Sequence, residues 1–177
     1  MSKPATAKWY HPTVLLVTWF ASGLVPKGKG TAGSLAALPF AWVFYQYGGP
    51  LALWVATIAA TAIGWWASAR YMRMHNRQDD PQEIVIDEVA GQWLVLACVP
   101  LLYLDPTPKQ EFVVFIGAFL CFRLFDIWKP WPISLADRKV KGALGVMLDD
   151  LLAMPYAVML LGFLGHLDQI AEAIIGG

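Results

Sequence analysis

Apolar residues form six runs along this chain, with short polar connections between them. The runs cover residues 13–25, 35–47, 51–69, 89–104, 112–128 and 143–164. The last four approach or reach the roughly 20 residues that a helix needs to cross a membrane. The second run would cover only about 20 Å at 1.5 Å per residue. The pattern predicts an all-α, polytopic membrane bundle with about four full transmembrane helices. A short N-terminal pair of helices, re-entrant or tilted, would precede them.

The composition favours a membrane protein with a single domain. Hydrophobic residues make up 58% of the chain and charged residues 15%, whereas roughly 25% of a typical soluble domain is charged. No flexible linker or charge run divides the sequence, so we expect one membrane-embedded domain over residues 1–177. The net charge of zero argues against a nucleic-acid partner, which would require a basic surface. The composition does not indicate an oligomeric state.

Basic residues in the connections predict which helix ends face the cytoplasm, because cytoplasmic loops carry an excess of Lys and Arg. Three arginines lie within residues 70–77, and three lysines and one arginine lie within 129–141. The connection at 105–111 holds one lysine, and no Lys or Arg follows His166. The alternation predicts that the polar clusters of this chain all face the cytoplasm.

The first acidic cluster follows a helix-start signal. Residues 80–83, with the sequence DPQE, have an N-cap Asp, a Pro at the first helical position and a Glu three residues after the cap. We therefore expect Asp87 and Glu88 about two turns inside that helix. Gly91, one turn beyond Asp87, leaves space for another backbone to approach.

The second acidic cluster flanks two predicted helices. Prolines at 130 and 132 end the fifth run after Lys129, which places Asp126 in its last turn and Arg123 nearly one turn deeper. Asp149 and Asp150 follow about two turns into the last helix. Acids at a membrane boundary are costly unless positive charge compensates them. Taken alone, each group could be a helix-end ion pair or a partner of the helix dipole. Together they predict a site for Mg²⁺ or Mn²⁺, because every donor is an oxygen. The predicted metal ligands are Asp87, Glu88, Asp126, Asp149 and Asp150.

The stretch GLVPKGKGTAGS, residues 23–34, resembles a nucleotide-binding P-loop but departs from it. Gly30 follows Lys29 where that motif requires Ser or Thr, and an apolar run replaces the preceding strand. Thr31, Gly33 and Ser34 still form a good helix start, and amides at a helix N-terminus bind anions. We therefore expect this loop to bind a phosphate that does not belong to a nucleotide.

Other phosphatase mechanisms lack their signatures in this sequence. No Cys is followed by Arg at the required spacing, no His lies in a nucleophile motif, and no Asp-x-Asp motif occurs. The mechanism that remains is carboxylate and metal chemistry on a phosphorylated substrate at the cytoplasmic interface.

Four motifs follow one another over about residues 18–157: GTAGSLAALP, IDEVAGQW, FRLFDIWKPWPI and GVMLDD. In their order and spacing the chain resembles the phosphatidylglycerophosphatase A family of bacterial membrane enzymes. The chain departs from the family at Lys29, where Pro is usual, and at Gly142-Ala143, where Gly-Gly is usual. The resemblance implies Mg²⁺-dependent hydrolysis of phosphatidylglycerophosphate to phosphatidylglycerol and phosphate. It also implies a multi-pass protein of the inner membrane, with its active site facing the cytoplasm.

The expected roles follow from these motifs. We expect Asp87, Glu88 and Asp149 to be catalytic, with Asp87 as the first choice for the base or a transient nucleophile. The predicted phosphate-binding residues are Lys29, Thr31, Gly33, Ser34, Arg123 and Lys129.

Two alternatives belong to other classes of protein. An ion or proton transporter would use intramembrane acids as a relay. A non-catalytic membrane subunit would use its small residues, at 32–37 and 56–64, only for packing. The acidic residues gather at one predicted boundary of the membrane, which favours an enzyme over these two alternatives. Phosphatidic acid and lysophosphatidic acid, which carry a similar phosphomonoester, remain alternative substrates.

Overall fold

The computed structural model describes residues 9–77, 81–103 and 107–175, and these residues form helices without strands. Their order is α1 (Pro12–Val17), the short 3-10 helix η1 (Ser22–Leu24), α2 (Lys29–Met74), α3 (Ile86–Leu102), α4 (Pro108–Trp128), α5 (Ile133–Lys139) and α6 (Gly142–Ile175). The predicted all-α fold is therefore confirmed.

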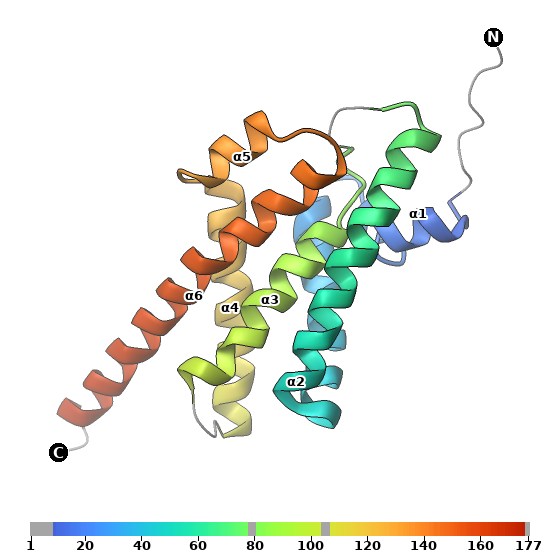
Figure 1. The fold of residues 1–177 in the computed structure, drawn as a ribbon. Coiled ribbons are helices and arrows are strands. Elements are labelled where there is room, and N and C mark those ends of the chain that lie inside the picture. The colour runs from blue at the N-terminus through green and yellow to red at the C-terminus, as the bar shows by residue number, and fades with distance from the viewer. Residues whose placement is uncertain (1–8, 78–80, 104–106, 176–177) are drawn as a thin grey trace, which may run out of the picture.

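Helix α2 consists of two helical halves, because the chain reverses direction at Gly49. This residue has φ 66° and ψ −169°, a backbone region that is essentially open only to glycine. Pro50 follows and begins the second half, where its fixed φ suits a first helical position. Figure 1 shows the first half running down and the second half running back up. The predicted runs at 35–47 and 51–69 lie in these two halves.

The first apolar run does not form one helix. Helix α1 ends at Val17, and the following residues Trp19, Phe20 and Ala21 all have positive φ angles. Helix α1 lies crosswise to α2 in Figure 1. The first member of the predicted short pair is thus a broken element, whereas the second belongs to a longer helix that begins at Lys29.

The predicted helix start at residues 80–83 is wrong. Helix α3 begins at Ile86, and the DPQE stretch precedes it; Asp80 lies outside the described residues. Glu83 does not cap the helix, because its Oε1 accepts a hydrogen bond from the Tyr71 hydroxyl at 3.0 Å and lies 3.5 Å from Arg77 Nη1. The partners from the end of α2 therefore override the local capping signal.

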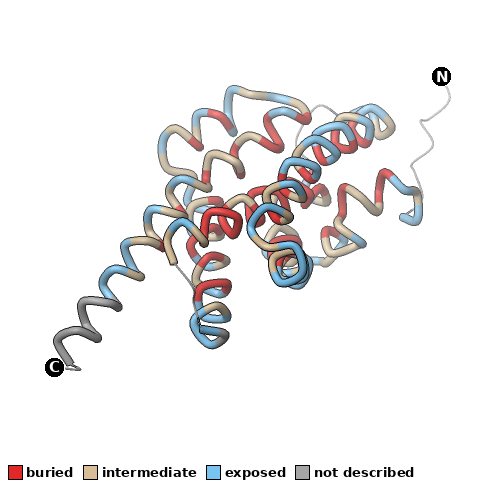
Figure 2. Tube along the Cα trace, turned by 60° about the horizontal axis from the view of Figure 1, so that its bottom comes forward, coloured by how far each residue is buried: buried red, intermediate tan, exposed pale blue. Residues whose placement is uncertain are grey.

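Helix α3 lies in the middle of the bundle, packed against α2, α4 and α6. Most of its residues are buried, as the red segments of Figure 2 illustrate for the interior of the molecule. A Cβ atom on Gly91 would lie 2.7 Å from Phe122 Cε2 and 3.1 Å from Asp150 Cβ. A close approach at Gly91 is therefore present, but side chains make it and not the expected backbone: Phe122 of α4 and Asp150 of α6 pack against the first turns of α3.

The polar helix ends gather at one end of the bundle. Helices α2, α3 and α6 begin, and α4 ends, in the upper part of Figure 1, whereas α2 turns at the lower end. By length and composition, the helices Lys29–Met74 and Gly142–Leu167 are apolar enough to cross a membrane.

Candidate active site

Three carboxylates from two helices meet at the upper end of the bundle. Asp87 and Glu88 lie in the first turn of α3, and Asp150 lies about two turns into α6, as predicted for that helix. One oxygen from each lies within 4.8 Å of the others. Asp87 and Asp150 are only 7% and 2% exposed. The predicted depth of Asp87 and Glu88 is corrected from two turns to the first turn, where the helix dipole stabilises negative charge.

Asp126 extends the cluster from the last turn of α4. Its buried carboxylate lies beside Asp150, and its negative charge also acts on Glu88. The neighbouring Arg123 holds it, with 2.6 Å between Nη1 of the arginine and Oδ2 of Asp126. The helix-end ion pair and the acidic cluster are therefore parts of one arrangement.

Asp149 faces a cation that caps α4. Lys129 follows the last residue of that helix, and its Nζ donates to Asp149 Oδ2 and, at 2.6 Å, to Asp137 Oδ1 of α5. Burial lowers the pKa of Lys129, but the hydrogen bonds and charges of the two aspartates outweigh burial and raise the pKa above its usual value. Lys129 therefore stays protonated beside the cluster.

The first turn of α2 closes the site from the other side. Nη1 of Arg123 donates to the Ser34 hydroxyl at 3.3 Å, and that hydroxyl donates to the Gly30 carbonyl at 3.0 Å. A Cβ on Gly30 would overlap the Glu88 carboxylate. Glycine at this position is what allows the start of α2 to approach the acids.

The other residues predicted to bind phosphate lie around this turn. Nζ of Lys29 lies 3.9 Å from Glu83 Oε2, and Thr31 is exposed. Gly33 packs on Val85, because a Cβ there would lie 2.7 Å from the Val85 Cβ. Since the N-cap of α2 is Gly28, the amides that lack an intrahelical acceptor belong to residues 28–31, and Gly33 lies deeper in the helix.

The residues of this cluster fit a divalent metal ion. Among the described residues, Glu88 Oε2, Asp149 Oδ1 and Asp150 Oδ2 are buried and accept no hydrogen bond. Buried carboxylate oxygens are costly unless a cation compensates them. Oxygen ligands at this spacing suit Mg²⁺ or Mn²⁺ chemically.

Gln92 is a further candidate site residue, which no sequence motif indicated. It lies one turn after Glu88 and therefore on the same face of α3. It is fully buried, and neither polar atom of its side chain has a hydrogen-bond partner within the described part of the chain. A lone amide inside the apolar run at 89–104 is the signal that could have identified it.

A family model described as phosphatidylglycerophosphatase A matches residues 15–165. The chain belongs to the phosphatidylglycerophosphatase A family. A protein of this name from Escherichia coli (strain K12) is 37% identical over 163 residues, which cover 90% of this chain and 87% of the relative. A protein of the same name from Haemophilus influenzae is 34% identical over 152 residues, which cover 84% of this chain and 86% of the relative.

Members of the phosphatidylglycerophosphatase A family are phosphatases, so this chain is a hydrolase, and the transporter and non-catalytic alternatives fall away. A related Bacteroides thetaiotaomicron protein, named provisionally as a phosphatidylinositol-3-phosphatase, is 35% identical over 153 residues, which cover 84% of this chain and 90% of the relative. No solved structure matches the chain significantly. The names of the relatives imply a phospholipid substrate.

Proposed function

We propose that this phosphatase removes the terminal phosphate of phosphatidylglycerophosphate in a Mg²⁺-dependent reaction, and that it does so at the cytoplasmic face of the bacterial inner membrane. One observation carries the proposal: oxygens of Asp87, Glu88 and Asp150 lie within 4.8 Å of one another in a chain of this family. The partly exposed cation Arg123 beside them supports a negatively charged substrate.

Asp87, Glu88 and Asp150 would hold the Mg²⁺, with Asp126 and Asp149 at its margins. When bound, the ion would neutralise charge on the phosphate and lower the pKa of a bound water. The unsatisfied oxygens of Glu88 and Asp150 support this assignment, because a cation would compensate them.

The surrounding cations and amides would bind and orient the phosphate. Arg123 offers guanidinium donors that match phosphate oxygens, and Lys129 offers a protonated amine. The amides of residues 28–31 lie at the start of α2 and add donors and the positive end of its dipole. Asp87 is our choice for the group that accepts the proton of the attacking water, or that attacks phosphorus itself. These groups would hold the monoester for in-line displacement of its glycerol oxygen.

A lipid environment accounts for the surface of the bundle. Large apolar side chains are exposed on three helices, whereas soluble proteins rarely expose extended apolar surfaces. Figure 2 shows that exposed positions recur along these helices. Examples are Leu51 and Ile58 on α2, Val113 and Leu120 on α4, and Met159 and Phe163 on α6.

The helix lengths also fit a membrane. The 17 residues of α3 and 21 residues of α4 extend roughly 26 and 32 Å, close to the thickness of a hydrocarbon core. We therefore propose that α3 and α4 cross the membrane together with α6 and both halves of α2, because the first half of α2 runs from the acid-bearing end to the turn at Gly49 and the second half returns (Figure 1). The basic residues at 70–77 and 129–141 favour a cytoplasmic location for the end that carries the acids.

The test is phosphate release by purified protein from three lipids: phosphatidylglycerophosphate, phosphatidic acid and phosphatidylinositol 3-phosphate. We expect the highest kcat/KM for the first. An Arg123→Gln variant should lose most of this activity, whereas Arg138→Gln, on the exposed face of α5, should retain it. A higher kcat/KM for either of the other lipids would reject the proposed substrate.

A further inference from the structure

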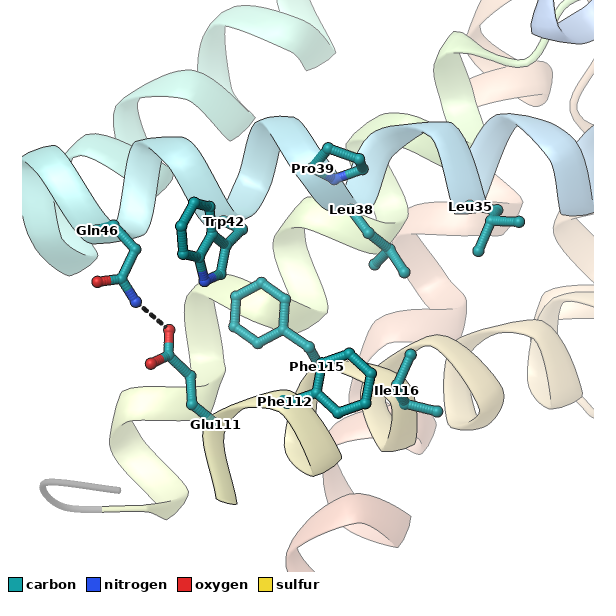
Figure 3. A pocket seen from close by; sticks show the side chains of 9 residues that line it. All are labelled: Leu35, Leu38, Pro39, Trp42, Gln46, Glu111, Phe112, Phe115 and Ile116. Carbon is teal, nitrogen blue, oxygen red and sulfur yellow. Dashed lines mark hydrogen bonds between the residues drawn. The ribbon is translucent and has the colours of Figure 1, made fainter. Parts of the chain in front are cut away.

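A separate apolar groove lies between the first half of α2 and the beginning of α4 (Figure 3). Its volume is about 710 Å³, which is within the usual range for sites that bind small molecules. Leucine, isoleucine and aromatic side chains make up most of its lining. They include Leu35, Leu38, Trp42, Phe112, Phe115 and Ile116.

The groove follows one stripe of side chains on α2. Ser34, Leu38, Trp42 and Gln46 occur at four-residue spacing and therefore lie on one face of that helix. Ser34 belongs to the active site through its bond with Arg123, and the next three line the groove. The face that begins at the phosphate-binding end thus continues directly as the apolar wall.

A matching stripe lies on α4 in the opposite direction. Arg123, Phe119, Phe115 and Glu111 also occur at four-residue spacing. The two stripes are tied at both ends: Arg123 donates to Ser34 at the active site, and the Gln46 amide donates to Glu111 at the far end. Twelve helical residues separate these ties on each helix, roughly 18 Å at 1.5 Å per residue. The groove therefore lies between these two ties: its lining includes Gln46 and Glu111 at the far end, and it extends to Leu35 and Ile116 on the side of the active site.

The side of the groove is open. Leu35, Trp42 and Phe112 line it and yet are 53%, 49% and 70% exposed. An occupant can therefore enter from the surface that we assign to the lipid, and it must be apolar along most of its length.

We propose that this groove binds one acyl chain of the phospholipid substrate while Arg123 holds its phosphate. The inference rests on the proposed function, because the acyl chain and the phosphate are parts of one molecule. The hydrogen bond between Gln46 and Glu111 ends the groove, so how well an acyl chain fits the groove depends on the length of that chain. The groove therefore gives the enzyme affinity for long-chain lipids that is independent of the phosphate.

The test compares phosphatidylglycerophosphate with dihexanoyl and with dioleoyl chains. Leu35→Trp and Ile116→Trp narrow the groove from its two walls. Val43→Trp and Val113→Trp are the matched controls, because these valines are 46% and 60% exposed on the same two helices and do not line the groove.

We expect the groove variants to lose about ten-fold in kcat/KM for the dioleoyl lipid, mainly through KM, because binding shared by ground state and transition state is removed. For the dihexanoyl lipid, kcat/KM of the groove variants should stay within about two-fold of that of the unmodified protein. The control variants should stay within the same range for both lipids. Equal losses on the two lipids, or none on either, would overturn the groove assignment. A second result would also overturn it: the unmodified protein is a dimer, the groove variants are monomers, and the ratio of kcat/KM between the dioleoyl and dihexanoyl lipids is unchanged.

A second readout separates this inference from the proposed function. If the unmodified protein releases phosphate from neither lipid, the proposed function fails. The groove is then judged by photo-cross-linking of phosphatidylglycerol that carries a diazirine near the end of its acyl chain. Labelling of residues 35–46 should fall in Ile116→Trp and persist in Val113→Trp. Labelling that is the same in both variants would reject an acyl chain in the groove.

Discussion

Gly30 and Glu88 lie so close together that a methyl group on Gly30 would overlap the Glu88 carboxylate. The same Cβ would lie 3.1 Å from Nη2 of Arg123. The absence of a side chain at residue 30 thus lets the start of α2 reach both the acids and the cation. This contact joins the glycine-rich stretch, which imitates a P-loop, to the carboxylates of the other helices.

We predict that Gly30→Ala lowers kcat/KM by at least about ten-fold, or 1.4 kcal/mol in transition-state stabilisation, because Glu88 and Arg123 must move. Gly162→Ala is the matched control. Its added Cβ would lie 3.2 Å from the Leu102 side chain, which can shift. Initial rates and melting temperatures of both variants check this. A fully active Gly30→Ala protein would show that the close approach has no role in catalysis.

Lys129 links Asp149 to Asp137 across the end of α4. Lys129→Gln leaves the buried Asp149 without its cation, and breaking a buried pair is costly. We expect kcat to fall by at least about ten-fold, whereas substitution of the exposed Lys139 of α5, Lys139→Gln, should leave kcat as in the unmodified protein. Steady-state kinetics distinguish these outcomes. Equal rates for the two variants would remove Lys129 from the active site.

The Ser34 hydroxyl positions Arg123. Ser34→Ala removes a hydrogen bond to a charged group, worth about 1.5 kcal/mol or roughly ten-fold in kcat/KM. Thr61→Ala is a suitable control, because the Thr61 hydroxyl also bonds a carbonyl four residues earlier in α2. The contrast between the two variants is measured as kcat/KM. Similar small losses in both would mean that the Ser34 bond serves only the helix.

The sequence predicted helix ends where a proline or glycine determines the end locally, without contacts from other segments. Helix α4 ends at Trp128, just before Pro130, and α6 begins at Gly142. The depth of Asp149 and Asp150 in α6 was therefore predictable by counting turns. The turn at Gly49 lay in the short break between two apolar runs, where the sequence also placed a connection.

Prediction from the sequence failed where side-chain contacts with other segments determine the structure. The capping pattern at 80–83 predicted a helix, but Tyr71 and Arg77 engage Glu83. The acids and Arg123 were predicted to share a layer, whereas the bond from Arg123 to Ser34 depends on how α4 packs against α2. Helix packing fixes such pairs, and no local pattern along the chain encodes it.

The most direct test of the central claim is the Mg²⁺ dependence of phosphate release from phosphatidylglycerophosphate. The assay uses detergent-purified protein with Mg²⁺, with EDTA and after Mg²⁺ is restored, alongside folded Asp150→Asn protein. We predict that EDTA abolishes the activity and that Mg²⁺ restores it. The Mg²⁺ concentration that gives half-maximal activity should be at least about ten-fold higher in the variant, because Asp150 is a proposed ligand. Activity that survives EDTA, or the same Mg²⁺ requirement in both proteins, would contradict this prediction.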